Sequence, residues 1–250
     1  MHTLIPEDEI RDLNERFESA QPLEIVRWAL EDSGIERIAL ASAFQAEGTC
    51  VMHMASLVRP DIEVLFLETG FHFAETLAFK EQLADRLGLT VTDLVGAYTV
   101  EQQTAGFGER LYERDPQQCC EVNKVRPMFE ALQKLDAWIT AFRRDSSPTR
   151  ATAPILDRYE LEPGRPILKV NPVVSWTRSD TLAYLSEHGL PHNHLYDLGY
   201  ASIGCAPCTR MRFEGEPERA GRWAGLSKWE CGIHQREAAG RIDLTGGSAA

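Results

Sequence analysis

Residues 38–48 have the sequence IALASAFQAEG and contain the change of pattern from which the fold can be inferred. The apolar run at 38–41 is typical of a short buried strand, and the polar stretch 42–48 is typical of a turn. The apolar segment 49–57 then continues as a helix. A strand, a turn and a helix in this order predict one unit of an α/β sheet.

The same order recurs further along the chain. Residues 62–67 form a second predicted strand, and the helix after it ends at Gly88, a residue type that commonly stops helices. A helix is also predicted at 178–188, because Thr177 and Asp180 have the spacing of an N-terminal capping box. Further strands are predicted at 89–95, 137–141 and 167–170. This alternation predicts an α/β fold with a mostly parallel sheet and helices on both faces.

The part of the chain before the first strand has a helical pattern. Leu13 and Phe17 have the spacing of an amphipathic helix within residues 7–32, which we expect to form a packing layer. The chain then divides into three parts: N-terminal helices at 1–35, the α/β domain at 36–215 and a flexible C-terminal segment at 216–250.

The composition limits the class of protein. With 250 residues and 43% hydrophobic residues, the chain can bury the core of one large domain. The formal net charge of -12 argues against nucleic-acid binding, because phosphate backbones are bound by basic surfaces. No N-terminal apolar run resembles a signal peptide, and no stretch approaches the roughly 20 apolar residues of a membrane span. We therefore expect a cytoplasmic protein that binds no membrane.

The chain has six cysteines, and a cytoplasmic location favours metal ligands, nucleophiles or buried thiols over disulfides. Four of them form two tight pairs, Cys119 with Cys120 and Cys205 with Cys208, which together could supply four thiolates to one metal centre. Adjacent cysteines are unusual for zinc, whereas a cubane cluster offers a separate iron to each sulfur. The pattern favours a [4Fe–4S] cluster, with zinc as the alternative.

Cys231 lies close to the C-terminus and belongs to neither pair, whereas Cys50 lies in an apolar run and is expected to pack in the core. The nearby His234 and basic residues would lower the pKa of the Cys231 thiol and favour a nucleophile. The adjacent Glu230 works against this, because a carboxylate disfavours a thiolate. From these residues alone, a structural thiol is the other interpretation of Cys231.

Ligands of parallel α/β sheets bind at the carboxyl ends of the strands. The loops predicted at this edge are 42–48, 68–70 and 142–145. The first loop could present backbone N–H groups and the start of the following helix to a nucleotide, although it is neither a Walker motif nor GxGxxG.

Basic side chains gather in these loops and around the cysteines. Several of them converging in so acidic a chain favour recognition of phosphate or sulfate. Lys124 is expected on the same helix face as Cys120, and Arg219 shares a face with Arg222 if that segment is helical. The basic candidates are Lys124, Arg143, Arg144, Arg150, Arg219 and Arg222.

Five motifs together resemble one known family. They are CCxxxK at 119–124, WITAFRRDSS at 138–147, NPVVSW at 171–176, GYASIGCAPCT at 199–209 and ECGIH at 230–234. The chain resembles the assimilatory adenylyl-sulfate reductases of bacteria and plants, within the APS/PAPS reductase family, because it combines adjacent cysteines, a CxxC pair and ECGIH. The resemblance extends from about residue 36 to residue 234.

The resemblance implies a single Rossmann-like domain of the adenine-nucleotide α-hydrolase type. It also implies reduction of adenosine 5'-phosphosulfate (APS) to sulfite and AMP in sulfate assimilation and cysteine biosynthesis. Thioredoxin would be the electron donor. Whether the chain forms a homo-oligomer is left open. Cys231 would be the nucleophile and would carry an S-sulfocysteine intermediate.

The family's site residues are carried over by position. One [4Fe–4S] cluster per chain would be held by Cys119, Cys120, Cys205 and Cys208. The phosphosulfate would face Lys124, Arg219, Arg222 and His234. Further substrate contacts are expected from Ser42, Phe44, Leu67, Thr69, Gly70, Arg143, Arg144 and Arg150.

Two positions depart from the family pattern. Ala43 stands where the family often has a second serine after Ser42, so one hydroxyl contact is missing. Ala141 replaces a glycine that is common after the fourth strand, so its methyl group crowds the approach of a ligand to the backbone.

Other functions would use some of the same residues. A PAPS reductase needs a pocket for a 3'-phosphate, and members with that preference generally lack the two cysteine pairs, so APS is favoured while use of both substrates stays open. An ATP pyrophosphatase or amide-forming ligase could share the sheet, but this chain lacks the SGGxDS loop that holds pyrophosphate. A non-catalytic iron–sulfur sensor or zinc module would use the cysteine pairs but not Cys231.

Overall fold

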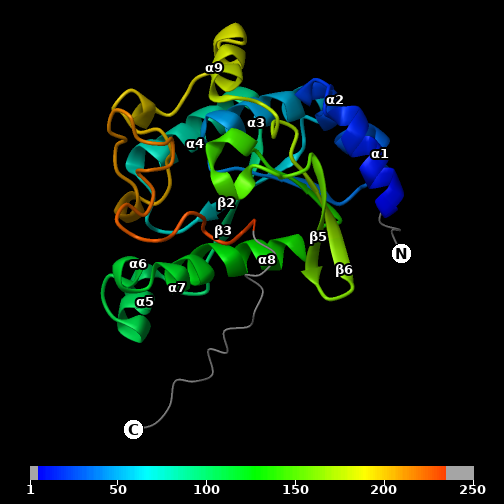
Figure 1. The fold of residues 1–250 in the computed structure, drawn as a ribbon. Helices are drawn as coiled ribbons and strands as arrows, with labels where there is room; N and C mark the ends of the chain where they lie inside the picture. The colour runs from blue at the N-terminus through cyan, green and yellow to red at the C-terminus, as the bar shows by residue number, and fades with distance from the viewer. Residues whose placement is uncertain (1–4, 235–250) are drawn as a thin grey trace.

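The computed structural model describes residues 5–234, which fold around one six-stranded sheet (Figure 1). The strand order is β3-β2-β1-β4-β6-β5, and all neighbours pair in parallel except β6 and β5, which are antiparallel. The strands are β1 (Ile38–Ala41), β2 (Glu63–Glu68), β3 (Thr90–Val95), β4 (Ala137–Ile139), β5 (Leu156–Glu162) and β6 (Arg165–Val170). The predicted α/β fold with a mostly parallel sheet is confirmed.

Helices cover both faces of the sheet. In Figure 1, α3 (Ala46–Val58), α4 (Ala74–Leu87) and α9 (Arg178–Glu187) lie above the sheet, and α8 (Arg126–Leu132) lies below it. Two clusters of buried apolar residues lie on the two faces: a larger core that includes residues of α3 and a smaller core that includes residues of α8. Successive residues of β4 point to opposite faces, so Ile139 is buried in the larger core and Trp138 in the smaller core. A central strand therefore needs apolar residues on both sides, which explains its continuous apolar run.

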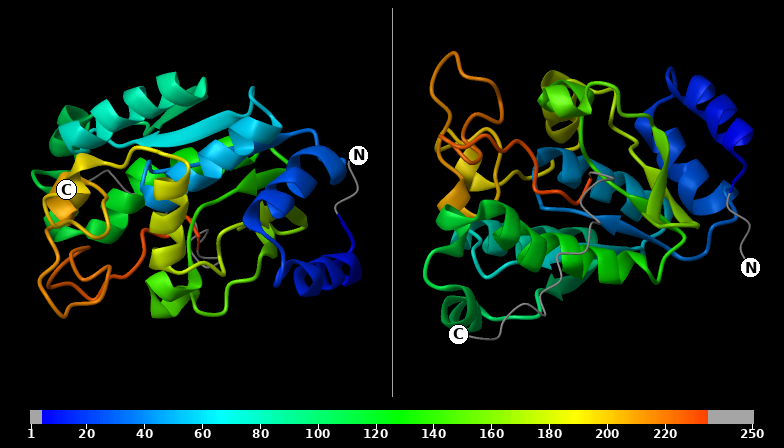
Figure 2. Two further views of the ribbon diagram at one scale, coloured as in Figure 1. Left: turned by 90° about the horizontal axis from the view of Figure 1, so that it is seen from above. Right: turned by 60° about the horizontal axis from the view of Figure 1, so that its bottom comes forward.

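The N-terminal helices α1 (Glu7–Phe17) and α2 (Pro22–Arg27) lie beside the antiparallel edge of the sheet, as both views in Figure 2 show. Three apolar residues of α1 are buried in the larger core. Asn14 joins this helix to β5, because its side chain donates to the Leu156 carbonyl and accepts from the Leu156 N–H, both at 2.8 Å. The N-terminal helices thus share a core with the sheet, while the exact division of the chain into parts stays a prediction.

Local sequence signals place the helix ends correctly. In α9 the Thr177 side chain accepts from the Asp180 N–H, and the Asp180 carboxylate accepts from the Thr177 N–H, as the capping-box pattern predicts. Gly88 follows α4 with a left-handed backbone at φ 65°, the conformation for which glycine is favoured. No helix within residues 5–234 has the length and apolar character needed to cross a bilayer.

The structure contains elements that the sequence patterns do not predict. Only Leu156 and Leu161 are buried in β5, so this edge strand has no apolar alternation. The short helix α7 depends on a cap, since the Asp115 side chain accepts from the Gln118 N–H. The helices α5 (Val100–Phe107) and α6 (Leu111–Arg114) are not predicted, whereas α7 (Pro116–Cys120) ends at Cys120, which the sequence predicts on a helix with Lys124.

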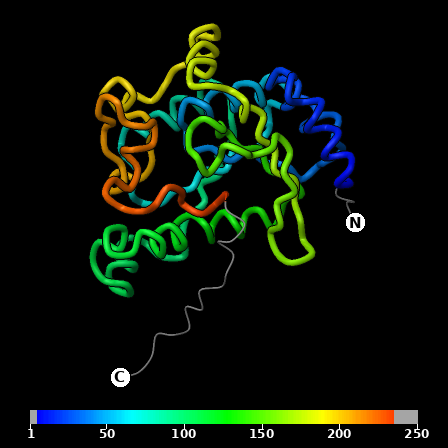
Figure 3. The backbone as a smooth tube through the Cα atoms, viewed as in Figure 1, coloured from blue at the N-terminus to red at the C-terminus, as the bar shows by residue number. Residues whose placement is uncertain are grey.

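The C-terminal part of the described chain forms mostly turns. Thr209 pairs with Arg222 in an isolated antiparallel bridge, so the helix considered for Arg219 and Arg222 is not present. In Figure 3 this part returns toward α8, where Ile233 packs against the smaller core. The predicted flexibility of the segment stays a prediction, and its residues 235–250 lie outside the described residues.

Candidate active site

A cavity of about 160 Å³, the central cavity, lies at the carboxyl ends of β1, β2 and β4. Ser42 follows β1, Leu67 belongs to β2, and Phe142 follows β4, as the rule for parallel sheets predicts. Residues from the C-terminal part, including Glu230 and Cys231, complete its wall. A larger groove of about 640 Å³ between α1 and β5 contains none of the predicted site residues, so size alone does not identify the site.

Four basic side chains line the central cavity: Lys124, Arg150, Arg219 and Arg222. Arg219 and Arg222 are buried, and their Nε atoms have no hydrogen-bond partner within the described residues. Burial, together with Arg150 and Arg222, lowers the pKa of Arg219 to about 10, which leaves it charged at neutral pH. Buried guanidinium groups with unused donors are costly unless an anion binds them. The central cavity is therefore suited to an anionic ligand.

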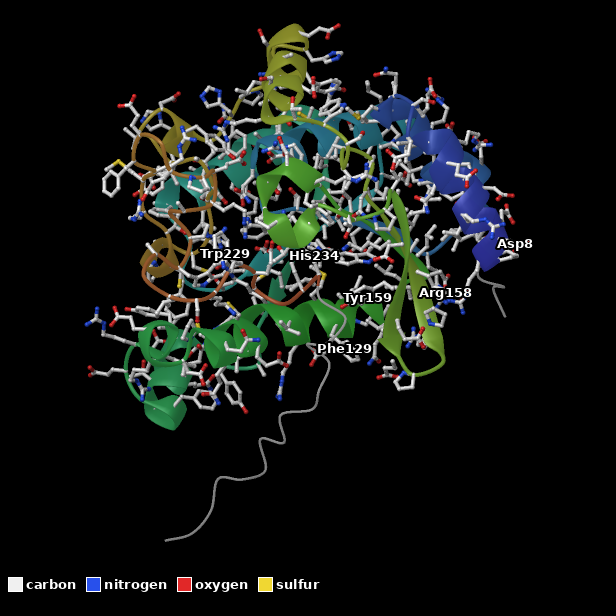
Figure 4. All side chains as sticks on the ribbon, in the orientation of Figure 1. Asp8, Phe129, Arg158, Tyr159, Trp229 and His234 are labelled. Carbon is white, nitrogen blue, oxygen red and sulfur yellow. The ribbon has the colours of Figure 1, made fainter. Side chains whose placement is uncertain are left out.

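The C-terminal part brings Cys231 and His234 into the same cavity. His234 stacks on Trp138, with ring centroids 5.5 Å apart and 14° between the planes, and lies 5.1 Å from the ring centroid of Phe142. Figure 4 shows His234 near the middle of the molecule and Trp229 nearer its edge, where it is half exposed. The late cysteine is thus part of a buried basic site.

The two cysteine pairs meet beside the central cavity. Cys119 and Cys120 end α7, and Cys205 precedes a 3-10 turn (Ala206–Cys208) that ends at Cys208. All four free thiols line one small space with Lys124. Burial and neighbouring thiols raise the pKa of Cys119 to about 12, and burial raises the pKa of Cys120 to about 11. Clustered thiols with such pKa values ionise when a metal binds them, so this donor set fits a metal centre.

Polar groups contact two of these sulfurs. Thr69 Oγ1 lies 3.3 Å from Cys205 Sγ, and the Asn123 amide donates to Cys119 Sγ at 3.6 Å. Burial would raise the pKa of Cys205, but Lys124 and the Thr69 contact lower it overall. No three histidine, cysteine, aspartate or glutamate side chains in residues 5–234 surround a single-ion position.

Lys124 lies in a π-helical turn, Glu121–Val125, where the sequence predicts an α-helix. The wider turn places its neighbour Asn123 against the buried Gln103 side chain, which accepts from Asn123 Nδ2 at 2.9 Å. Lys124 still lines the small space with the four paired thiols, and the nearby Cys205, Cys120 and Cys231 raise its pKa against the effect of burial.

The predicted substrate contacts divide into two sets. Those that line the central cavity are Ser42, Leu67 and Arg150, and those that do not are Phe44, Thr69 and Gly70. Phe44 is fully buried in the larger core and packs edge-on against Phe66, at the cost of a left-handed backbone at φ 52°. Thr69 contacts Cys205 and lines the small space of the paired cysteines instead. A sequence motif gives the position of such residues but not the direction of their side chains.

Arg143 and Arg144 do not line the central cavity, and each forms ion pairs; the substrate contacts expected of them stay a prediction. Arg143 is fully buried and donates to Glu47 at 2.8 Å and to Glu218 at 2.6 Å. Arg144 points to the other side of the loop and donates to Glu18 at 2.5 Å. Their guanidinium groups are occupied by carboxylates that are distant in sequence, which is why a local pattern does not reveal these roles.

Sequence reasoning misses several residues of the central cavity. His72 lines it, and its Nε2 atom forms a hydrogen bond of 2.7 Å with the Leu67 carbonyl. Gly204 also lines it, and a Cβ at this position would overlap with the Arg222 guanidinium group. Glu230 enters the wall as a buried carboxylate. The glycine before Cys205 is the one local signal that could have indicated a close approach.

Replacing Gly204 with alanine is expected to displace Arg222 while the fold is kept. The overlapping atoms belong to the end of a flexible side chain, and the Gly204 backbone is not in the left-handed region. We expect kcat/KM to fall about 10- to 100-fold, because a displaced guanidinium group loses part of its stabilisation of a bound anion. Gly106→Ala is the matched control, since a Cβ at Gly106 meets no atom within 4 Å. Equal activity of the two variants would contradict this role of Gly204.

The stability of the protein should depend on the protonation of His234. Burial lowers its pKa well below the ordinary value, and Lys169, Arg150 and Arg219 act in the same direction. The folded protein therefore holds His234 neutral, whereas the unfolded chain binds a proton below about pH 6.5, so the free energy of unfolding falls as the pH drops below that value. Between about pH 7 and about pH 5.5, we expect the urea midpoint to fall more in the wild type than in His234→Asn. The exposed His194 supplies the control variant, His194→Asn, which should retain the wild-type dependence.

Comparisons with known proteins agree with this arrangement. Residues 37–211 match the phosphoadenosine phosphosulfate reductase domain. The adenosine 5'-phosphosulfate reductase of Streptomyces coelicolor is 42% identical over 231 residues, which cover 91% of this chain and 95% of that protein. The phosphoadenosine 5'-phosphosulfate reductase of Gloeobacter violaceus is 39% identical over 233 residues, which cover 92% of this chain and 95% of that protein.

Solved structures share the architecture. The phosphoadenylyl-sulfate reductase of Candida auris, in a phosphate complex, has a TM-score of 0.70 at 25% identity and covers 83% of this chain and 99% of its own. The FMN adenylyltransferase of Candida glabrata, at 12% identity, covers 92% of this chain and 79% of its own with a TM-score of 0.53 and so shares the fold. The implied class, an α/β domain of the adenine-nucleotide α-hydrolase type, is confirmed. The chain belongs to the phosphoadenosine phosphosulfate reductase family and is an oxidoreductase.

Proposed function

We propose that this protein reduces adenosine 5'-phosphosulfate to sulfite and AMP, using Cys231 as the nucleophile and thioredoxin as the reductant. The observation that carries the proposal is the position of Cys231 in a buried cavity that also contains Lys124, Arg219 and Arg222. Relatives named adenosine 5'-phosphosulfate reductase, 39–42% identical in Streptomyces, Halalkalibacterium and Mycolicibacterium, support this substrate. We assign the reaction to sulfate assimilation and cysteine biosynthesis in the cytoplasm.

The basic side chains bind and polarise the phosphosulfate group. The unused Nε donors of Arg219 and Arg222 supply hydrogen bonds to its oxygens, and Lys124 adds a third positive charge. These groups stabilise the negative charge that develops on the departing phosphate, an effect typically worth about 3 kcal/mol for each donor. The turn after β1, with Ser42, also lines the central cavity and is suited to the nucleoside part.

The first chemical step transfers the sulfonate group to the protein. The Cys231 thiolate attacks the sulfur of the phosphosulfate, a new S–S bond forms, and the S–O bond to the phosphate breaks. AMP leaves with the electron pair, and Cys231 carries an S-sulfonate. Lys124 lines the same cavity, so its ammonium group stabilises negative charge as the reaction proceeds. His234 is neutral at neutral pH, and its Nδ1 atom, which has no hydrogen-bond partner within residues 5–234, is available to hydrogen-bond the substrate.

The second step uses two electrons from thioredoxin. A thioredoxin thiolate attacks the Cys231 sulfur, a mixed disulfide forms, and sulfite leaves with the electron pair of the broken S–S bond. The second thioredoxin thiol then attacks the mixed disulfide and returns Cys231 as a thiolate. A nucleophile on a late segment without regular structure suits this sequence, because Cys231 must meet first a small molecule and then a protein thiol.

Cys119, Cys120, Cys205 and Cys208 would hold the [4Fe–4S] cluster, one per chain. Their common lining of one small space supports this assignment, as does the approach of Thr69 and Asn123 to two of the sulfurs. When bound, the cluster would be held by thiolates from both α7 and the 205–208 turn and would so connect these two segments. Lys124 lies between this space and the central cavity and lines both.

The choice of nucleotide is tested by comparing two substrates. We expect kcat/KM for sulfite formation with thioredoxin to be at least about 10-fold higher for APS than for its 3'-phosphorylated form. The two nucleotides differ in the 3'-phosphate, and a substrate group that finds no partner in the site lowers the binding energy. The alternative, a PAPS reductase or an enzyme with dual specificity, has support in the Gloeobacter violaceus relative. A higher kcat/KM for the 3'-phosphorylated nucleotide would overturn the assignment to APS.

A further inference from the structure

We infer that Glu230 is a positioning residue whose ion pairs with Arg150 and Arg219 hold Cys231 in the central cavity. The inference rests on the proposed function, in which Cys231 is the nucleophile. It concerns residues 229–234, which we call the C-terminal strap. Glu230 is a carboxylate in a wall otherwise suited to anions, so its presence there needs an explanation.

The Glu230 carboxylate is bound on several sides. It is 7% exposed and accepts from Arg150 Nε and Nη2, both at 2.8 Å, and from Arg219 Nη2 at 3.3 Å. The hydroxyl groups of Ser147 and Thr149 donate to the same oxygen at 3.2 Å. These partners lower the pKa of Glu230 although burial would raise it. A two-point arginine contact with supporting hydroxyls fixes both the position and the orientation of a carboxylate.

These contacts connect two distant parts of the chain. Ser147, Thr149 and Arg150 belong to the loop after β4, which is anchored to the sheet, whereas Glu230 belongs to the C-terminal strap. Arg219 donates to the Trp229 carbonyl at 2.9 Å with the same nitrogen that reaches Glu230. The residue directly before Cys231 is therefore fixed to the end of the sheet, and the thiol has little freedom to leave the cavity while these contacts persist.

The carboxylate leaves enough donors for a substrate. The Nε atoms of Arg219 and Arg222 remain without partners in the described structure, and Lys124 and Arg222 make no hydrogen bond with Glu230. The contacts of Glu230 and those of a bound anion are thus divided between different nitrogen atoms. This division favours a Glu230 that holds the C-terminal strap in place while the substrate is bound. It argues against a Glu230 that competes with the substrate for the same donors. Arg150 and Arg219 also offset the negative charge of Glu230, which would otherwise disfavour the neighbouring thiolate.

The test compares the iron-loaded wild type with Glu230→Gln and with Glu216→Gln as the matched control. Glu216 also accepts from an arginine at two points, Arg210 at 2.8 Å for each contact, but does not touch the C-terminal strap. Three quantities are measured: the rate of Cys231 alkylation by iodoacetamide without substrate, the single-turnover rate of SO3 transfer from saturating APS without thioredoxin, and the dissociation constant of AMP.

We expect Glu230→Gln to raise the alkylation rate about tenfold and to lower the SO3 transfer rate about tenfold, because a neutral amide weakens the charge pairs that hold the strap. AMP affinity should stay within about threefold of the wild type, since the amide leaves the other donors in place. Glu216→Gln should match the wild type in all three. An unchanged alkylation rate overturns the inference, and so does an AMP affinity about tenfold higher with unchanged SO3 transfer, which would identify Glu230 as a competitor of the substrate.

A failure of the proposed function has a different signature. If the wild type gains no SO3, the nucleophile assignment is wrong, and the alkylation rates of the three proteins still decide whether Glu230 holds Cys231. If Glu230→Gln does not fold, the double variant Ser147→Ala, Thr149→Val removes the two hydroxyl donors and keeps the ion pairs. It should shift the alkylation and transfer rates about threefold in the same directions, and unchanged rates in this variant overturn the inference.

Discussion

Replacing Cys231 with serine is expected to abolish sulfite formation, with a loss of at least about 10³-fold in kcat. A serine hydroxyl has a far higher pKa than a thiol, and an oxygen cannot form the S-sulfonate from which a thioredoxin thiol releases sulfite. The variant should keep its iron and its affinity for AMP, because Cys231 is outside the cysteine pairs and the basic groups remain. Sulfite release, iron content and AMP binding are measured on the same preparation.

Cys50→Ser serves as the control for this substitution. Cys50 is a free thiol buried in the larger core, so its replacement tests the loss of a thiol outside the site. It should retain activity per folded molecule. A metalloprotein sensor would behave differently from a reductase, because Cys231→Ser would then leave the function intact. Normal sulfite formation by Cys231→Ser would therefore remove the basis for the reductase mechanism.

Replacing Cys208 with serine should remove the metal and lower the activity more than about 100-fold. Even changes to residues beside metal ligands lower metal affinity or activity about 10- to 100-fold. Cys208 is partly exposed, so this change disturbs packing less than replacement of the buried Cys205. We expect loss of iron and of SO3 transfer to Cys231. The iron-containing but inactive Cys231→Ser variant is the control that separates metal loss from loss of the nucleophile.

Removing the iron also separates the transfer of SO3 to Cys231 from the later release of sulfite. A wild-type protein that already carries the S-sulfonate should still release sulfite to thioredoxin after its iron is removed, because that step needs only the Cys231 sulfur and the partner's thiols. Full activity of an iron-free protein with fresh APS would refute the requirement for the cluster. One zinc ion per chain in place of iron, found by metal analysis, would instead support the zinc alternative.

The sequence predicts the inner strands β1 and β4 well because they are buried on both faces. Continuous apolar runs such as 137–141 and a capping box such as Thr177 with Asp180 depend on nearby residues, so they are visible without a structure. The edge strand β5 is the opposite case, because it is stabilised by pairing with β6 and by Asn14 from α1. The short helices before the cysteines likewise depend on caps and tertiary contacts, which a periodic pattern does not contain.

The candidate site can be predicted where the chemistry requires a particular residue type. It cannot be predicted where the role depends on the direction in which a side chain points. The paired cysteines and Cys231 have rare spacings or fall in rare motifs, and the structure places them around two adjoining cavities. Arg143 belongs to the same motif as other candidates but points into a cluster of carboxylates. Glu230 is the reverse case: its charge argues against a thiolate from the sequence, and only the folded arrangement reveals the arginines that offset it.

The intact mass of anaerobically purified protein, mixed with APS in the absence of thioredoxin, tests the central claim most directly. The account predicts a gain of one SO3 per chain, located on Cys231 by peptide mapping and removed when reduced thioredoxin is added. An unchanged mass with AMP and sulfite nevertheless released, or an SO3 group on any other residue, would contradict it.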